Sequence, residues 1–146
     1  MKVRLDINKD YDEVCINVCA PKDTNEIRDI YNRIKNIFEE SFVVHDGKEA
    51  ITVNVSDIIR IYGANKQVYI HTDQGQFRIN ERLYEMEERL DKRCFVRISN
   101  SEIVNIGRLR RMDTSLAGTI KMYLDEGTET YVSRRYVPVI KKTLGI

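Results

Sequence analysis

The sequence predicts a mainly β protein with short helices, built from small antiparallel sheets and preceded by a small strand–strand–helix α/β extension. After Glu40, short apolar or alternating runs are separated by turn signals such as Asp46-Gly47 and Asp125-Glu126-Gly127. Before that point, two strand-like runs are followed by one helical stripe of apolar residues. We therefore divide the chain into an α/β extension, residues 1–44, and a β domain, residues 45–146.

The extension begins with two predicted strands, residues 2–7 and 14–20, and Pro21 ends the second. A helix over residues 24–40 follows, where Asp23 and Glu26 have the spacing of a capping box. Its apolar residues form one stripe: Ile27, Ile30, Tyr31, Ile34, Ile37 and Phe38. We expect this stripe to pack on the two strands, and the alternative is a surface for a partner or a second copy.

From residue 42 onward we expect nine short strands or strand-like runs, because apolar residues recur with period two between turn residues. They are residues 42–44, 51–55, 58–62, 68–72, 76–79, 95–98, 107–112, 119–124 and 128–132. Three helical pieces interrupt these strands. A charged helix is predicted over residues 81–90, and Ser99 with Glu102 has the form of a capping box that opens a helical turn. A terminal helix is predicted to start after Ser133.

The charges are unevenly distributed along the chain, although the formal net charge is only +1. Residues 1–44 and 45–92 each hold seven Lys or Arg against nine Asp or Glu, whereas residues 93–146 hold ten against five. A basic end on an otherwise balanced chain is expected if one surface faces an anion. An incidentally basic surface is the alternative.

Two predicted helix starts combine serine caps with basic or amide side chains. Arg97 and Asn100 surround Ser99, while Arg134 and Arg135 follow Ser133. A helix N-terminus presents unpaired N–H groups, and a nearby guanidinium adds charge and a bidentate fork, so both sites suit a phosphate. Either cluster alone is more commonly a structural cap with solvated arginines.

Three stretches of the chain carry a recognisable pattern: FVRISNSEIVNIGRLRRM, TYVSRRYVPVIKKTLG and, upstream, VNVSDIIRIYGANKQVYIHTDQGQFRINERLYEMEERL. Together they extend over about 100 residues and resemble the LytTR DNA-binding family. The chain looks like a small stand-alone LytTR transcriptional regulator without a receiver domain. It departs from the family pattern at Tyr62-Gly63, where an acidic residue is common. The loop position that is often a base-reading polar or basic residue in the family falls near Gln67 or Val68 in this chain.

The resemblance implies an elongated stack of small antiparallel sheets whose loops and helix starts enter successive major grooves of repeated DNA half-sites. It places the first loop at 64–68, the second around 99–101 and the third at 134–135. Arg135 is the leading candidate to read guanine, Asn100 would read adenine or hold a phosphate, and Arg134 lies beside them. The remaining candidates are phosphate or loop residues: Lys66, Gln67, Arg97, Ser99 and Ser101.

The resemblance also implies double-stranded DNA as the main partner, a homodimer on that DNA and control by a membrane-bound inhibitor protein. No apolar run is long enough to span a bilayer, so we expect a cytoplasmic protein. The competing hypothesis is a β-rich protein-interaction module with an incidentally basic C-terminal surface, supported mainly by the helix stripe.

No catalytic, cofactor or metal site is predicted. His45 and His71 lack thiol or acidic partners at metal-ligand spacing, and no serine lies in a nucleophile motif. Cys15, Cys19 and Cys94 form no CxxC pair, and we expect reduced, mostly buried thiols.

Overall fold

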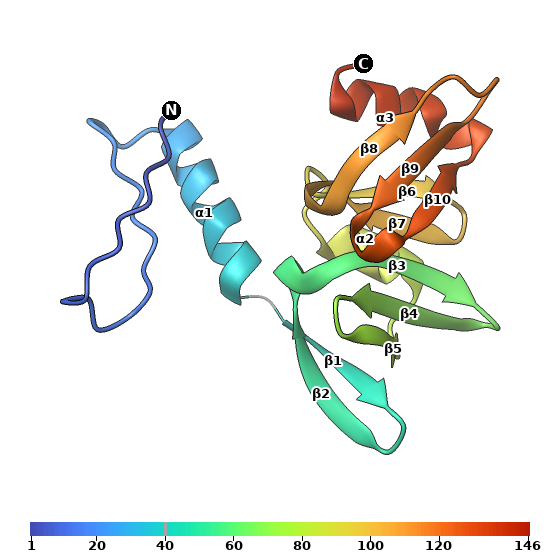
Figure 1. Ribbon diagram of the computed structural model, residues 1–146, viewed down its shortest axis with the longest axis horizontal. Helices are drawn as coiled ribbons and strands as arrows, with labels where there is room; N and C mark the ends of the chain where they lie inside the picture. Colours follow the sequence, from blue (N-terminus) through green and yellow to red (C-terminus); the bar gives the residue numbers. More distant parts are fainter. Residues whose placement is uncertain (40) are drawn as a thin grey trace.

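The computed structural model describes residues 1–39 and 41–146, with the side chains of residues 36–39 outside that description. In the described part, ten strands form two antiparallel sheets accompanied by three α-helices and four 3-10 helices (Figure 1). The predicted mainly β fold with short helices is therefore confirmed. The 3-10 helices are η1 (Val55–Asp57), η2 (Ile106–Arg108), η3 (Asp125–Gly127) and η4 (Arg134–Tyr136).

The larger sheet has seven strands in the order β2-β1-β5-β4-β3-β7-β6. Their bounds are β1 Ser41–Asp46, β2 Glu49–Asn54, β3 Ile58–Ala64, β4 Gln67–Thr72, β5 Gly75–Ile79, β6 Phe95–Ser99 and β7 Glu102–Asn105. Strand β1 crosses the boundary predicted at residue 44, and its Phe42 and Val44 are buried in the core of this sheet. Residues 41–44 thus belong to the large sheet, and Phe42 and Val44 pack in its core.

The smaller sheet has three strands in the order β10-β9-β8: β8 Leu109–Asp113, β9 Ile120–Leu124 and β10 Glu129–Val132. The chain then enters η4 and the terminal helix α3, Val137–Leu144, which was predicted. Ile140 of α3 is fully buried against this half of the molecule. In Figure 1 the small sheet and α3 lie above the large sheet.

Two hydrophobic cores lie on opposite faces of β3, β6 and β7. Ile58 and Ile61 belong to the first core with helix α2, Leu83–Arg89, whereas Ile59 belongs to the second core with the small sheet and α3. A register shift between Ile58 and Arg60 explains why two residues three positions apart face the same core. Because both faces are covered, β3 opens with consecutive apolar residues instead of alternating ones.

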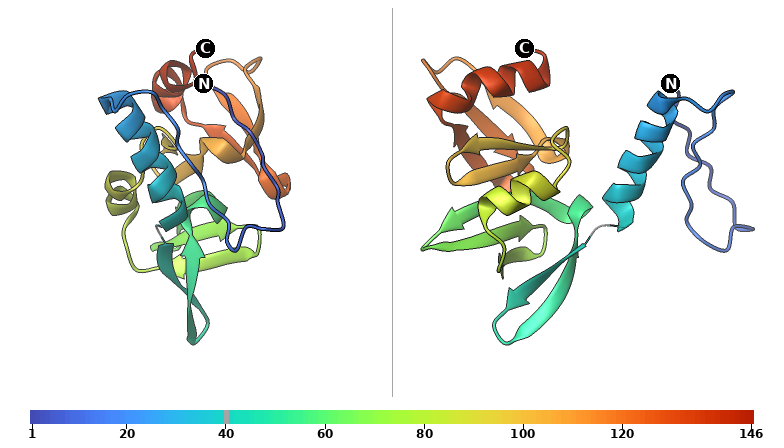
Figure 2. Two further views of the ribbon diagram at one scale, coloured as in Figure 1. Left: turned by 90° about the vertical axis from the view of Figure 1, so that its left-hand side faces the viewer. Right: turned by 180° about the vertical axis from the view of Figure 1, so that it is seen from behind.

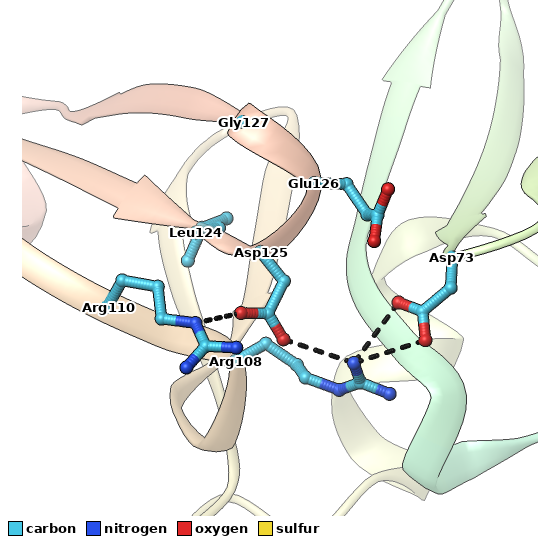
Figure 3. A pocket seen from close by; sticks show the side chains of 7 residues that line it. All are labelled: Asp73, Arg108, Arg110, Leu124, Asp125, Glu126 and Gly127. Atoms are coloured by element: carbon cyan, nitrogen blue, oxygen red, sulfur yellow. Dashed lines mark hydrogen bonds and ion pairs between the residues drawn. The ribbon is translucent and has the colours of Figure 1, made fainter.

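Arg108 in η2 ties the two sheets together (Figure 3). Its guanidinium lies 3.1 Å from Asp73 after β4 and 3.1 Å from Asp125 after β9, and Nη2 donates to the carbonyl of Ser56 over 2.9 Å. Arg110 also binds Asp125. Burial alone lowers the pKa of Arg108, but the two carboxylates outweigh it and the net pKa shift is upward.

The extension differs from the prediction. Helix α1, Asn25–Glu39, is confirmed, but the strands predicted over residues 2–7 and 14–20 are wrong, because residues 1–24 form no strand. The two segments run as extended arms beside α1, on the side away from the sheets (Figures 1 and 2). Isolated two-stranded pairings are marginal in water, and within the described residues no third strand supports them.

The predicted packing of the helix stripe on these strands is also wrong. Val3 and Val14 are 90% and 99% exposed, and α1 instead contacts η1 and β2. Ile37 and Phe38, the last members of the predicted stripe, lie outside the described side chains. Over residues 1–39 and 41–146, no helix has both the length and the apolar composition that a bilayer span requires.

The expected burial of the cysteines fails for the same reason. Cys15 and Cys19 are exposed because the strand that would have carried them is not formed. Cys94 is half-buried, and burial raises the pKa of its thiol.

Candidate nucleic-acid interface

The first candidate element is the two-residue turn between β3 and β4. Ala64 pairs with Gln67, and between them Asn65 and Lys66 have φ values of +53° and +61°. Positive φ at both central positions is the pattern of a type I′ hairpin turn, in which Asn-Gly is the preferred sequence. Lys66 is exposed and occupies a position where glycine would be less strained.

The second element is the turn between β6 and β7. The helical turn predicted to start at Ser99 is wrong: Ser99 pairs with Glu102 across a tight hairpin, and the Ser99 hydroxyl accepts a hydrogen bond from the Ser101 N–H over 3.2 Å. A serine oxygen that binds a backbone N–H two residues on is a turn device as well as a cap. Burial of the following Ile103 and Val104 between two cores favours a strand there.

Arg97 holds this second turn in shape. Its Nε donates to the Ser99 carbonyl over 2.7 Å, and its Nη2 donates to the Asn100 carbonyl over 2.5 Å. The third nitrogen binds the Glu87 carboxylate of α2 over 2.5 Å. Only 18% of the Arg97 side chain is exposed, so its guanidinium supports the turn from the protein side and not from the solvent side.

The third element is η4 with the start of α3. Ser133 precedes η4 as predicted, but its side chain caps nothing; its carbonyl accepts the Tyr136 N–H over 2.8 Å. Arg134 and Arg135 are both exposed. Arg134 extends across Gly118, whose φ is +74° and whose missing side chain leaves room for the guanidinium, while Arg135 lies 5.8 Å from the centroid of the Tyr136 ring.

The three elements form one continuous row, although they are far apart in the sequence. The Gly63 N–H donates to the Ser101 carbonyl over 2.8 Å, which joins the first turn to the second. The Ser133 N–H donates to the Ile98 carbonyl over 2.9 Å, and the Tyr136 hydroxyl donates to Oδ1 of Asn100 over 3.1 Å. These bonds join the second turn to η4. We call Lys66, Gln67, Ser99, Asn100, Ser101, Arg134 and Arg135 the recognition row.

The row carries cations whose charge is not neutralised within the protein. Across the described part of the chain, no ion pair or hydrogen bond engages the side chains of Lys66, Arg134 or Arg135. Some basic groups away from the row are paired with acids, such as Arg60 with Glu102 at 3.1 Å and Lys121 with Glu129 at 2.9 Å. The row thus presents three cations that no acidic side chain of the described residues neutralises.

Sequence reasoning missed two residues that build the row, Gly63 and Tyr136, and misplaced a third. Glu102, predicted to complete a capping box, instead starts β7 and accepts hydrogen bonds from Arg60 over 3.1 Å and from the Thr130 hydroxyl over 2.7 Å. It thus fixes the second turn against both sheets. The one available signal for Tyr136 was an aromatic residue directly after the paired arginines.

The histidines lie outside the row. Nδ1 of His71 accepts a hydrogen bond from Arg60 over 3.3 Å, and burial, with the Arg60 charge, lowers the pKa of this imidazole. His45 lies 3.3 Å from the Asn80 amide. In the described residues no group of three or more His, Cys, Asp or Glu side chains is placed to hold a metal ion.

Comparison with known proteins decides the family. The model of the LytTr DNA-binding domain matches residues 48–145, which include β2 to β10, the recognition row and α3. The chain belongs to the LytTR family. Solved structures agree on the fold: a LytTr DNA-binding domain from Bacillus cereus superimposes with a TM-score of 0.71 at 23% identity, covering 74% of this chain and 99% of that one.

Relatives of this LytTR protein also match outside the family model. An uncharacterized HTH-type transcriptional regulator of Staphylococcus aureus strain NCTC 8325 is 37% identical over 147 residues, covering 100% of this chain and 99% of the relative. The equivalent protein of the bovine strain RF122 is 36% identical over the same length. The similarity thus includes the extension. In the described residues of the LytTR protein, strands separate all three α-helices, so none of them follows another directly as in a helix-turn-helix.

Proposed function

We propose that this protein is a DNA-binding transcription regulator that reads repeated half-sites by inserting the recognition row into successive major grooves. The observation that carries the proposal is the row itself: three turns or helix starts, joined by hydrogen bonds, that present Lys66, Arg134 and Arg135 without acidic partners. Phosphate binding requires such uncompensated cations. The family membership and the names of the relatives support the same conclusion.

The conformation of Lys66 favours a functional role for the first turn. A non-glycine residue in the left-handed region costs about 1–2 kcal/mol. Strain of this kind persists mainly where function needs the side chain. Lys66 is at the tip of a hairpin, exposed, and one residue from Gln67, so we assign it to a phosphate and Gln67 to the groove edge.

The roles of the other residues follow from their contacts. Arg135 is exposed and has no polar partner in the described chain, so its fork is available to guanine O6 and N7. Arg134, braced over Gly118, suits a phosphate. Asn100 keeps its amide nitrogen available because only Oδ1 accepts the Tyr136 bond. Ser99 and Ser101 face the same groove, and Arg97 contributes by shaping their turn.

We further propose that residues 45–146 are the DNA-binding domain, that residues 1–44 are an accessory extension and that two copies bind side by side on bent DNA. Control by a membrane-bound inhibitor protein is proposed from the family resemblance alone. Co-purification of the full chain with membrane proteins, and loss of DNA binding in their presence, tests that partner.

The main test is selection of binding sites from random duplexes with the full-length protein. We expect enrichment of a repeated motif, and we expect the affinity for that motif to fall steeply with salt because several phosphates are neutralised. Sequenced pools that enrich no motif after repeated rounds would exclude sequence-specific recognition. They would favour the competing protein-interaction module.

A further inference from the structure

One largely buried carboxylate, that of Glu102, joins strands that lead to all three elements of the recognition row. Glu102 begins β7 directly after the second turn and pairs with Tyr62 of β3. Its Oε1 accepts a hydrogen bond over 3.1 Å from Arg60 of β3, the strand that leads to the first turn. Its Oε2 accepts one over 2.7 Å from the hydroxyl of Thr130 in β10, the strand that leads to η4. The two oxygens of a single side chain thus bind one strand from each sheet.

The partners of Glu102 are themselves held in place. Nε of Arg60 donates to Nδ1 of His71 over 3.3 Å, and the guanidinium lies 4.7 Å from the centroid of the Tyr62 ring. Thr130 is buried in the small sheet. Because Arg60 is held on three sides and Thr130 is buried, their hydrogen bonds fix where Glu102, and with it the second turn, lies between the sheets.

The burial of this network favours a positioning role over a stabilising one. The side chains of Arg60 and Glu102 are only 21% and 12% exposed. At such burial the loss of hydration offsets much of the attraction between the charges, so an ion pair adds little net stability. A displacement that breaks the hydrogen bonds is still costly, because it leaves a buried charge without a partner. The network therefore resists changes in the spacing of the two sheets at this point.

A second tie between the sheets lies at the other end of β3, away from the row. Arg108 binds Asp73, which follows β4 at the end where β3 begins (Figure 3). Glu102 instead pairs with Tyr62 near the end of β3, one position from the bond that the Gly63 N–H makes to the second turn. Both ties join the large sheet to the small one, but only the Glu102 tie lies at the row. A variant of the Arg108 tie is therefore a matched control.

We propose that Glu102, acting through Arg60 and Thr130, is a positioning residue that sets the spacing of the elements of the recognition row. The proposed base readers Asn100 and Arg135 lie on the second turn and on η4, the elements that the Thr130 bond joins. Stacked base pairs follow one another at about 3.4 Å along the duplex, so a row of fixed spacing rejects a site with one base pair too many. This inference rests on the proposed function and adds spacing specificity to it.

Amide hydrogen exchange on the free protein provides the first experiment. The amide protons of Gly63 and Ser133 report on the row, because each donates to a neighbouring element. Thr130→Val removes the hydroxyl and should make the Ser133 amide exchange at least about tenfold faster than the other sheet amides do, while Glu102→Ala should do so at both amides. Thr130→Ser keeps the hydroxyl and should restore protection. Unchanged protection in T130V, or an equal loss in the control Asp73→Asn, overturns the proposal.

Duplexes selected by the parent protein provide the second experiment. The base pairs read by Asn100 and Arg135 are first located as those at which the alanine variants lose discrimination. One base pair inserted between them should weaken binding of the parent at least about tenfold, and that of Thr130→Val less than about threefold. Thr130→Ser should behave as the parent does. Asp73→Asn should keep the ratio of the parent, because the Arg108 tie does not touch the row.

The results separate the positioning role from the proposed function. A purely structural role of Thr130 would lower the affinity of T130V for both duplexes by the same factor, and an unchanged ratio would overturn the inference while leaving sequence-specific binding intact. A parent that tolerates the inserted base pair would do the same. Selection of no motif at all would overturn the proposed function, and the inference with it.

Discussion

The Tyr136 hydroxyl donates a hydrogen bond to Oδ1 of Asn100 over 3.1 Å, across a sequence separation of 36 residues. This bond joins the turn between β6 and β7 to the first turn of η4, and the Ser133 N–H supports it by binding the Ile98 carbonyl. It also fixes the orientation of the Asn100 amide, so that the nitrogen points away from Tyr136. The pair therefore orients a proposed base-reading group without itself needing to touch DNA.

Tyr136→Phe should reduce DNA discrimination while leaving the fold unchanged, because it removes one hydrogen bond and no packing. The expected loss is about 0.5–1.5 kcal/mol in binding to the selected site. A double-mutant cycle with Asn100→Ala, read by DNA titration, should give non-additive losses because the two side chains act together. Strictly additive losses would show that the two side chains act independently.

Arg135→Ala should cost about 1–3 kcal/mol of discrimination against a changed guanine, with a smaller effect on unrelated duplexes. Arg135→Lys keeps the charge but loses the bidentate fork, so it should recover non-specific affinity and not discrimination. Lys142→Ala, at the far end of α3, is the matched control for lost charge. Titration of the selected duplex and single-base variants measures both effects. A uniform loss over all sequences would reassign Arg135 to a phosphate.

Lys66→Gly should act in opposite directions on stability and on DNA binding. Glycine relieves the positive φ of +61°, so the free energy of unfolding should rise by about 1 kcal/mol. Loss of the cation should weaken all duplexes about equally and lower the salt slope by about one. Lys48→Gly in the turn between β1 and β2 is the control, since the φ of Lys48 is not positive. Unchanged DNA affinity in K66G would remove the first turn from the interface.

Asp125 should make the stability of the protein sensitive to acid. Burial by itself raises the pKa of its carboxyl, but hydrogen bonds from Arg108 and Arg110 outweigh it and depress the pKa below its ordinary value. A depressed pKa means that the stabilising contribution is present above the unfolded pKa and is lost as the pH falls through the folded one. Denaturant unfolding at several pH values should therefore show stability decreasing below about pH 4.

Asp125→Asn tests the cause of that acid sensitivity. It should lower the free energy of unfolding by about 1–3 kcal/mol at neutral pH, because Arg108 loses a charged partner between the sheets. It should also make the free energy of unfolding less dependent on pH below about pH 4. Asp46→Asn, at the exposed last residue of β1, is the control and should do neither. A D125N variant with the acid dependence of the parent would assign that dependence to another carboxyl.

Local pattern predicted most of the β domain because its strands are short, apolar and bounded by strong turn residues. The runs at residues 58–62, 68–72 and 119–124 lie within or almost within β3, β4 and β9. The pattern failed at Ser99–Glu102, where a serine followed three residues later by a glutamate fits a helix cap as well as a hairpin turn. Ile103 is buried in one core and Val104 in the other, which requires a strand after this turn. This burial decides for the hairpin turn over the helix cap.

The sequence by itself determined the mainly β class, the terminal helix and the basic segments at 97–101 and 133–135. Tertiary structure decided how those segments meet: hydrogen bonds from Gly63, Ser133 and Tyr136 depend on strands brought together across the sheets, which no local spacing encodes. It also decided that Arg97 faces inward while Arg135 remains available. In the extension the alternating pattern is present, but residues 1–24 form no strand, because a lone pair of strands is marginal in water and no further strand of the described residues lies beside it.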